Sequence, residues 1–112
     1  MLKNASDYRF MRLMVFFDLP MLTQEEVRRY TRFHKFLLKN GYIMMQYSVY
    51  SKILQNKDSL NWHMEVLKKN LPPDGSVITL SITEKQYAGM KKLVGSKKAL
   101  DKKITSKSLL IF

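Results

Sequence analysis

Apolar and polar residues repeat with different periods along the chain and predict three strand regions. Residues 12–17 (RLMVFF) form a short apolar run that is typical of a strand buried on both faces, at the centre of a sheet. Residues 42–54 exceed the usual strand length and carry polar Gln46 and Ser48 near the middle, which predicts two consecutive strands. Residues 76–83 alternate as a half-buried strand does. Its apolar residues are Ile78, Leu80 and Ile82, and its hydroxyl residues are Thr79, Ser81 and Thr83.

A helix is predicted over residues 23–40. Thr23 and Glu26 have the spacing of a capping box, and Asn40 with Gly41 is a normal helix stop. The side expected to face the core carries Val27, Tyr30, His34, Leu37 and Leu38. The opposite side, which we call the cationic stripe, carries Arg28, Arg32, Lys35 and Lys39.

A second helix is predicted over residues 58–71, ended by the Pro-Pro-Asp-Gly sequence at 72–75. Its expected inner face carries Leu60, Met64, Leu67 and Leu71. The resulting order βαββαβ is the ferredoxin-like, α+β arrangement, in which two helices cover one face of an antiparallel sheet. The other face needs a cover, and a second copy of the same sheet in a twofold homodimer would supply it.

The chain divides into a core and a C-terminal part. We expect a ferredoxin-like core domain over residues 1–95, with residues 1–10 as an N-terminal extension. Residues 96–112 form a lysine-rich connector followed by the apolar end 109–112. Such an apolar end is expected to pair as an extra strand, on its own sheet or on that of its partner.

Composition narrows the function to a small set. The chain has 112 residues with a net charge of +11, which favours nucleic acid or an anionic membrane as the partner. No apolar run approaches the roughly 18 residues that span a bilayer, and a secretory signal pattern is missing, so we expect a cytoplasmic protein without a membrane partner. Because there is no cysteine, disulfides, thiolate zinc sites and cysteine nucleophiles are excluded. Gly-rich phosphate loops and serine hydrolase or metalloprotease motifs are also missing.

Asp18, at the end of the first strand, is the candidate catalytic and metal-binding residue. The functional interpretation is a carboxylate at a strand end, and the structural one is an acidic residue that shapes the Asp-Leu-Pro turn. Hydrolysis of a phosphodiester by Mg²⁺ needs several oxygen ligands, whereas Glu25 and Glu26 are explained by helix capping. A metal site would therefore need Asp18 from both members of a dimer, completed by water and phosphate oxygens.

The cationic stripe is the candidate nucleic-acid-binding surface, because cations one turn apart can follow a phosphate backbone without reading bases. The structural alternative is an ordinary solvated helix face. No acidic residue interrupts residues 27–42, and Phe36 beside the stripe is expected to be available to a partner. His34 and His63 are each isolated from other metal-binding side chains and are interpreted as partly buried helix residues.

Four segments together resemble a known family. They are residues 8–20 (YRFMRLMVFFDLP), 33–44 (FHKFLLKNGYIM), 46–52 (QYSVYSK) and 83–87 (TEKQY). In this order they are similar to the small core CRISPR-associated protein often called Cas-two, in the form that accompanies type II systems. The resemblance covers roughly residues 8–95 and is weaker beyond them.

The resemblance implies a fold, partners and an activity. It implies a ferredoxin-like homodimer with an exchanged C-terminal strand, which bridges two dimers of the CRISPR integrase. That complex captures double-stranded DNA and integrates it as a new spacer, so the implied role is a DNA-binding adaptor. It also implies a metal-dependent endoribonuclease or DNase with Mg²⁺ at the aspartate that matches Asp18. Adaptor and Mg²⁺-dependent endonuclease remain the two hypotheses, because the adaptor role requires no chemistry from this subunit.

Overall fold

The structure is a computed structural model that describes residues 10–94 of the chain. The elements follow in the order β1 (Met11–Asp18), α2 (Gln24–Lys39), β2 (Ile43–Gln46), β3 (Val49–Leu54), α3 (Lys57–Lys69), β4 (Ser76–Thr83) and α4 (Glu84–Ala88). The predicted βαββαβ order is confirmed, with the short helix α4 added at its end. Most of the predicted N-terminal extension, and the whole predicted connector and C-terminal strand, lie outside the described residues.

The strands form one antiparallel sheet in the order β2-β3-β1-β4, which is the ferredoxin-like arrangement. β1 is a central strand, as its continuous apolar sequence predicts. It pairs with β4 along its whole length, from Met11 opposite Thr83 to Asp18 opposite Ser76. The long segment 42–54 is two strands, as predicted, and they join at Tyr47 and Ser48.

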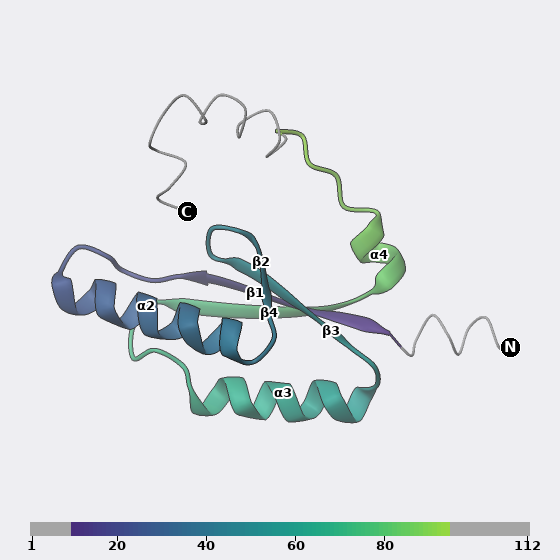
Figure 1. Ribbon diagram of the computed structural model, residues 1–112, viewed down its shortest axis with the longest axis horizontal. Coiled ribbons are helices and arrows are strands. Elements are labelled where there is room, and N and C mark those ends of the chain that lie inside the picture. Colours follow the sequence, from purple (N-terminus) through teal and green to yellow (C-terminus); the bar gives the residue numbers. More distant parts are fainter. Residues whose placement is uncertain (1–9, 95–112) are drawn as a thin grey trace, which may run out of the picture.

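α2 and α3 lie together on one side of the sheet, and α4 lies on the other (Figure 1). The core forms between the sheet and the first two helices. Phe17 of β1 is central to it, since its ring packs edge-on against Phe33 at 5.0 Å and stacks on Tyr50 at 5.4 Å between centroids. The buried core residues are Leu13, Val15, Phe17, Leu19, Tyr30, Phe33, Leu37, Tyr42, Tyr50, Leu54 and Leu67.

α2 begins and ends where the sequence predicts, but its buried face is rotated from the predicted one. Thr23 and Glu26 form the capping box, and Asn40 is the C-cap. The buried residues of the helix are Tyr30, Phe33 and Leu37. The prediction was wrong for Val27 and Leu38, which are exposed, and for Phe36, which packs against the core. The large Phe33 and Phe36 rings draw the helix toward them, because burying an aromatic ring contributes more than burying Val or Leu.

α3 is also shorter than predicted. It ends at Lys69 with Asn70 as its cap, so Leu71 lies beyond the helix and is 48% exposed rather than part of the inner face. Leu67 is buried, while Leu60 and Met64 are partly buried against the core. None of the helices in residues 10–94 is long and apolar enough to cross a membrane.

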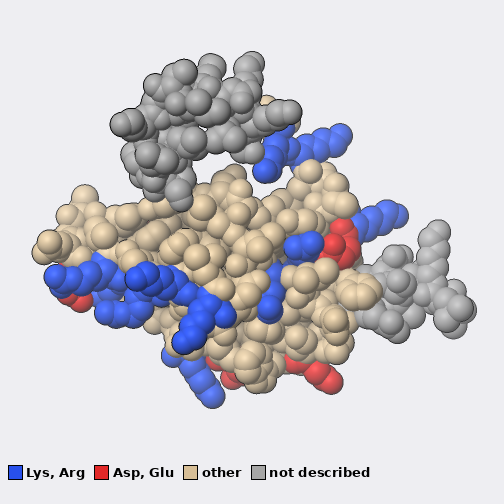
Figure 2. Space-filling view, viewed as in Figure 1, with Lys and Arg blue, Asp and Glu red and all other residues tan. Residues whose placement is uncertain are grey.

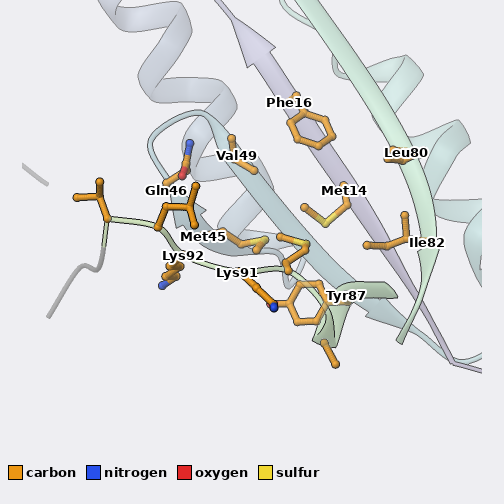
Figure 3. A pocket seen from close by; sticks show the side chains of 14 residues that line it. Met14, Phe16, Met45, Gln46, Val49, Leu80, Ile82, Tyr87, Lys91 and Lys92 are labelled. Carbon is orange, nitrogen blue, oxygen red and sulfur yellow. The ribbon is translucent and has the colours of Figure 1, made fainter. Parts of the chain in front are cut away.

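The apolar row of β4 faces away from α2 and α3. Val77 packs against the core, so by alternation Ile78, Leu80 and Ile82 point to the open face of the sheet. Ile78 is 61% exposed and Leu80 is 52% exposed. Leu80 and Ile82, together with Met14 and Phe16, line a groove of about 800 Å³, along one side of which residues 87–94 run (Figure 3). The open face is therefore an apolar surface.

Candidate functional site

Asp18 is the last residue of β1, and its side chain is exposed. Its neighbours in sequence, Phe17 and Leu19, are both buried in the core. This anchoring on both sides fixes the backbone at Asp18 while the carboxylate points outward. Alternation along β1 places Asp18 on the open side of the sheet, together with Met14 and Phe16.

Gly75 lets the turn before β4 approach Asp18 closely. Its φ is +88°, and a Cβ at this position would lie 2.6 Å from the backbone oxygen of Asp18. Such a contact is impossible for any other residue without a shift of the backbone. The turn therefore brackets Asp18 on one side, and the buried Leu19 holds it on the other.

The Asp18 carboxylate makes no hydrogen bond or ion pair with any residue of the described chain. The nearest acidic residue in that turn, Asp74, is already engaged with Arg29 at 3.1 Å. Within residues 10–94 no three acidic or histidine side chains come close enough to hold a metal ion. Around the end of β1 the described residues thus offer one free carboxylate for Mg²⁺, which fits a single ligand position and not a complete site.

The two glutamates at the start of α2 have structural roles, as predicted. The Glu26 carboxylate accepts hydrogen bonds from the backbone N–H groups of Leu22 and Thr23, both at 2.9 Å. These bonds, that from Thr23 foremost, lower the pKa of Glu26 although burial opposes them. Glu25 pairs with Arg28 at 3.2 Å. Neither glutamate is a free metal ligand.

The cationic stripe lies on the outer side of α2, opposite its buried residues (Figure 2). All four of its side chains are exposed. Arg28 is paired with Glu25, which lies just before the acid-free residues 27–42. Arg32, Lys35 and Lys39 make no ion pair with the described residues. Three cations along one helix face are therefore available to an anionic partner.

Asp18 and the cationic stripe lie on different surfaces of the chain. The carboxylate is on the open side of the sheet, whereas the stripe faces away from the sheet on the helical side. The sheet and the body of α2 separate them. A partner that contacts both has to reach around the edge of the molecule near the start of α2.

A cluster at the other end of β1 has no counterpart in the sequence analysis. Arg12 donates to Glu84 at 2.6 Å, and its guanidinium lies 4.0 Å from the centroid of the Tyr87 ring. Thr83 and Gln86 form a capping box at the start of α4. The spacing Thr-x-x-Gln at 83–86 is the signal that predicts this helix start.

Tyrosine and histidine side chains meet between α2 and the β2–β3 turn, which the sequence analysis also missed. The Tyr30 hydroxyl shares a hydrogen bond of 3.1 Å with Ser48, and the Tyr50 hydroxyl shares one with His34 Nδ1. Burial raises the pKa of both tyrosines, so both are neutral phenols at physiological pH. His34 is partly buried, as predicted, and so is His63.

Comparisons with known proteins identify one family. The family model described as CRISPR associated protein Cas2 matches residues 11–90. A protein of Acidovorax ebreus is 47% identical over 102 residues, which cover 91% of this chain and 100% of that protein. A protein of Treponema denticola is 47% identical over 79% of this chain and 87% of its own length. One of Ligilactobacillus salivarius is 46% identical over 78% and 86%. All three are named CRISPR-associated endoribonuclease Cas2.

Proposed function

The chain belongs to the Cas2 family of CRISPR-associated proteins, and from this premise we propose that it is a dimeric, cytoplasmic DNA-binding adaptor of spacer acquisition. In this role it bridges integrase dimers and carries the duplex that is integrated as a new spacer. The observation that carries the proposal is the cationic stripe, where Arg32, Lys35 and Lys39 are exposed and lack acidic partners among the described residues. Such a row binds phosphates and is indifferent to sequence.

The open face of the sheet supports the homodimer. It carries an exposed apolar row on β4 and the groove lined by Met14 and Phe16. Exposed apolar surface of this kind marks an interaction site, and a second copy of the sheet has matching chemistry. Two copies joined by their open faces would each turn a cationic stripe outward, so one dimer would offer two phosphate-binding rows.

The decisive test compares two variants with equal loss of charge. The first carries Arg32→Gln, Lys35→Gln and Lys39→Gln on α2, and the control carries Lys57→Gln, Lys68→Gln and Lys69→Gln on α3, all at exposed positions. Affinity for a labelled DNA duplex is measured by fluorescence anisotropy over a range of salt. Spacer acquisition is measured in cells that carry the integrase and a repeat array.

We expect the α2 variant to bind duplex more weakly by about tenfold or more and to reduce the salt slope by about 2 to 3, since each phosphate contact contributes about 0.9. Spacer acquisition should fall with it, while the α3 control changes binding by less than about threefold. If the α2 variant binds and acquires spacers as well as the α3 control, the adaptor proposal is wrong.

A second candidate function is a Mg²⁺-dependent endonuclease. The relatives' name and the free carboxylate of Asp18 favour it. Asp18 from two copies would hold the ion, whose chemistry when bound is to activate water and to stabilise charge on the phosphate. The lack of further acidic ligands within the described residues places this candidate second.

The nuclease candidate is tested with purified protein on RNA and on double-stranded DNA. Cleavage should require Mg²⁺, stop with EDTA and fall by at least about a hundredfold in Asp18→Asn, which keeps the shape of the side chain. Asp58→Asn, at an exposed acidic residue in the first turn of α3, is the matched control. Cleavage that persists in Asp18→Asn would remove Asp18 from the chemistry.

A further inference from the structure

A hollow of about 190 Å³ opens between α2 and the β2–β3 turn, on the helical side of the sheet. It is distinct from the open-face groove, with which it shares no lining residue. Its lining is aromatic and polarisable rather than aliphatic. The main lining residues are Tyr30, Thr31, His34, Met44, Tyr47 and Tyr50.

One wall of the hollow is an ordered aromatic surface. Tyr47 is 47% exposed, and its ring stacks on Tyr30 with centroids 5.2 Å apart and planes inclined by 18°. The turn beneath it is fixed, because Ser48 adopts a φ of 66° and shares a hydrogen bond with the Tyr30 hydroxyl. The Tyr47 ring is therefore held in place before any ligand arrives, which lowers the entropic cost of stacking on it.

The part of the lining that α2 contributes also offers polar atoms. His34 uses Nδ1 for its hydrogen bond with Tyr50, and its Nε2 makes no hydrogen bond with a described residue. The Thr31 hydroxyl is exposed and likewise has no hydrogen-bond partner among the described residues. A flat aromatic ring and a few hydrogen-bonding groups that line one hollow are suited to recognise a planar heterocycle.

The positive charge beside the hollow indicates which kind of molecule carries that heterocycle. Thr31 lies three residues after Arg28 and four before Lys35, so both stripe residues are its neighbours on the helix surface. A strand whose phosphates follow the stripe brings its bases beside the hollow. In a duplex the bases are paired and stacked inside, so the hollow is open only to an unpaired base.

We propose that this hollow binds one unpaired nucleobase, stacked near Tyr47, of a strand whose phosphates lie on the cationic stripe. The inference rests on the proposed function for the phosphate contacts and adds a preference for a single-stranded segment. Stacking on an aromatic ring is sequence-tolerant, because every base has a π face.

The test uses the full chain, EDTA throughout, and two labelled single strands of equal length. One is oligothymidylate, and the other has the same backbone with abasic residues in place of the bases. We expect the wild-type chain to bind the base-bearing strand about tenfold more tightly. Tyr47→Ala should bring this ratio of affinities close to one without lowering the affinity for the abasic strand, whereas Tyr47→Phe should preserve the ratio.

Thr31→Leu is a second route that leaves the β2–β3 turn intact, since it fills the hollow from an exposed helical position. It should also abolish the ratio. Trp62→Ala, which removes an aromatic ring that is 59% exposed on α3, is the matched control and should leave the ratio unchanged.

Equal affinity of the wild-type chain for the two strands overturns the nucleobase site alone. An equal loss for both strands in Tyr47→Ala or Thr31→Leu overturns it as well. A wild-type chain that binds neither strand nor duplex overturns the proposed function together with this site. Neutralising the stripe should weaken both strands alike and leave their ratio near tenfold.

Discussion

The two ends of β1 carry charged residues of opposite sign on the same face of the sheet, and they differ in how completely the fold uses the charge. Arg12 has a side chain that is only 17% exposed, with a carboxylate at 2.6 Å and an aromatic face at 4.0 Å. Asp18 is exposed, without a hydrogen-bond or ion-pair partner among the described residues. The same strand thus carries a paired charge, Arg12, at one end and an unpaired charge, Asp18, at the other.

The difference separates a structural charge from a functional candidate. The contacts of Arg12 with Glu84 and Tyr87 hold α4 against the open side of the sheet, so their effect is to position an element. Asp18 positions nothing through its side chain, because the backbone around it is fixed by Phe17, Leu19 and Gly75. Substitutions at the Arg12 end should therefore change stability, and those at Asp18 should change ligand binding.

The largest loss of stability is expected from the backbone that brackets Asp18. Gly75→Ala places a Cβ at a φ of +88° and 2.6 Å from the Asp18 oxygen, which should cost about 3 kcal/mol of unfolding free energy, measured by urea denaturation. Gly89→Ala is the control, since its Cβ would meet only ordinary contacts at 3.4 Å and 3.5 Å. Equal stability of the two variants would mean that the turn does not hold Asp18.

A smaller loss of stability is expected at the Arg12 end of β1. Arg12→Met removes the ion pair and the cation–π contact but keeps the aliphatic stem, and should cost about 1 to 2 kcal/mol because the pair is only partly buried. Arg28→Met, which breaks an exposed pair on α2, should cost less than about 0.5 kcal/mol. If thermal and urea unfolding give the two variants the same stability, the contacts of Arg12 contribute no more than an exposed ion pair does.

Residue patterns predict the architecture well because periodicity is a local property. The capping box at Thr23, the stop at Asn40 and the apolar run of β1 each lie within a few residues, and each appears in the structure. Periodicity does not decide which side of a strand meets the helices. For β4 it shows that Ile78 and Leu80 share a face, yet that face is the open one.

The candidate site was predicted less completely, because contacts over long sequence separations leave no periodic trace. The positions of Asp18 and of the stripe follow from a strand end and a helix face, and the structure has them there. The partners of Arg12 lie more than seventy positions away, at 72 residues for Glu84, and only the fold brings them together. The pairing of Arg29 with Asp74, which removes a second carboxylate from the neighbourhood of Asp18, is equally non-local.

The unpaired Asp18 carboxylate should contribute little to stability itself. Asp18→Asn is expected to change the unfolding free energy by less than about 0.5 kcal/mol, since no contact within the described residues is lost. A Mg²⁺ titration then tests whether the Asp18 carboxylate binds the ion, because an ion bound only by the folded protein raises the melting temperature. The wild-type chain should show this rise and Asp18→Asn should not. A rise of equal size in both would place the ion elsewhere.

The smallest effect on stability is expected on the helical side of the sheet, where the cation of Lys52 lies near His63. Lys52, opposite Leu13 in the register, lies near His63, and burial together with this cation lowers the pKa of His63 below 6.5. The neighbouring Tyr42 stays neutral, since burial raises its pKa to about 12.

Between the folded pKa of His63 and 6.5 the unfolded chain binds more protons than the folded one, so stability rises with pH across that window and is lost as pH falls through it. Urea unfolding of the wild-type chain and of His63→Gln at pH 5.0 to 7.5 measures the effect. The wild-type chain should lose more stability on acidification than the variant, because Gln cannot take up the proton. Parallel pH profiles would show that folding does not lower the pKa of His63.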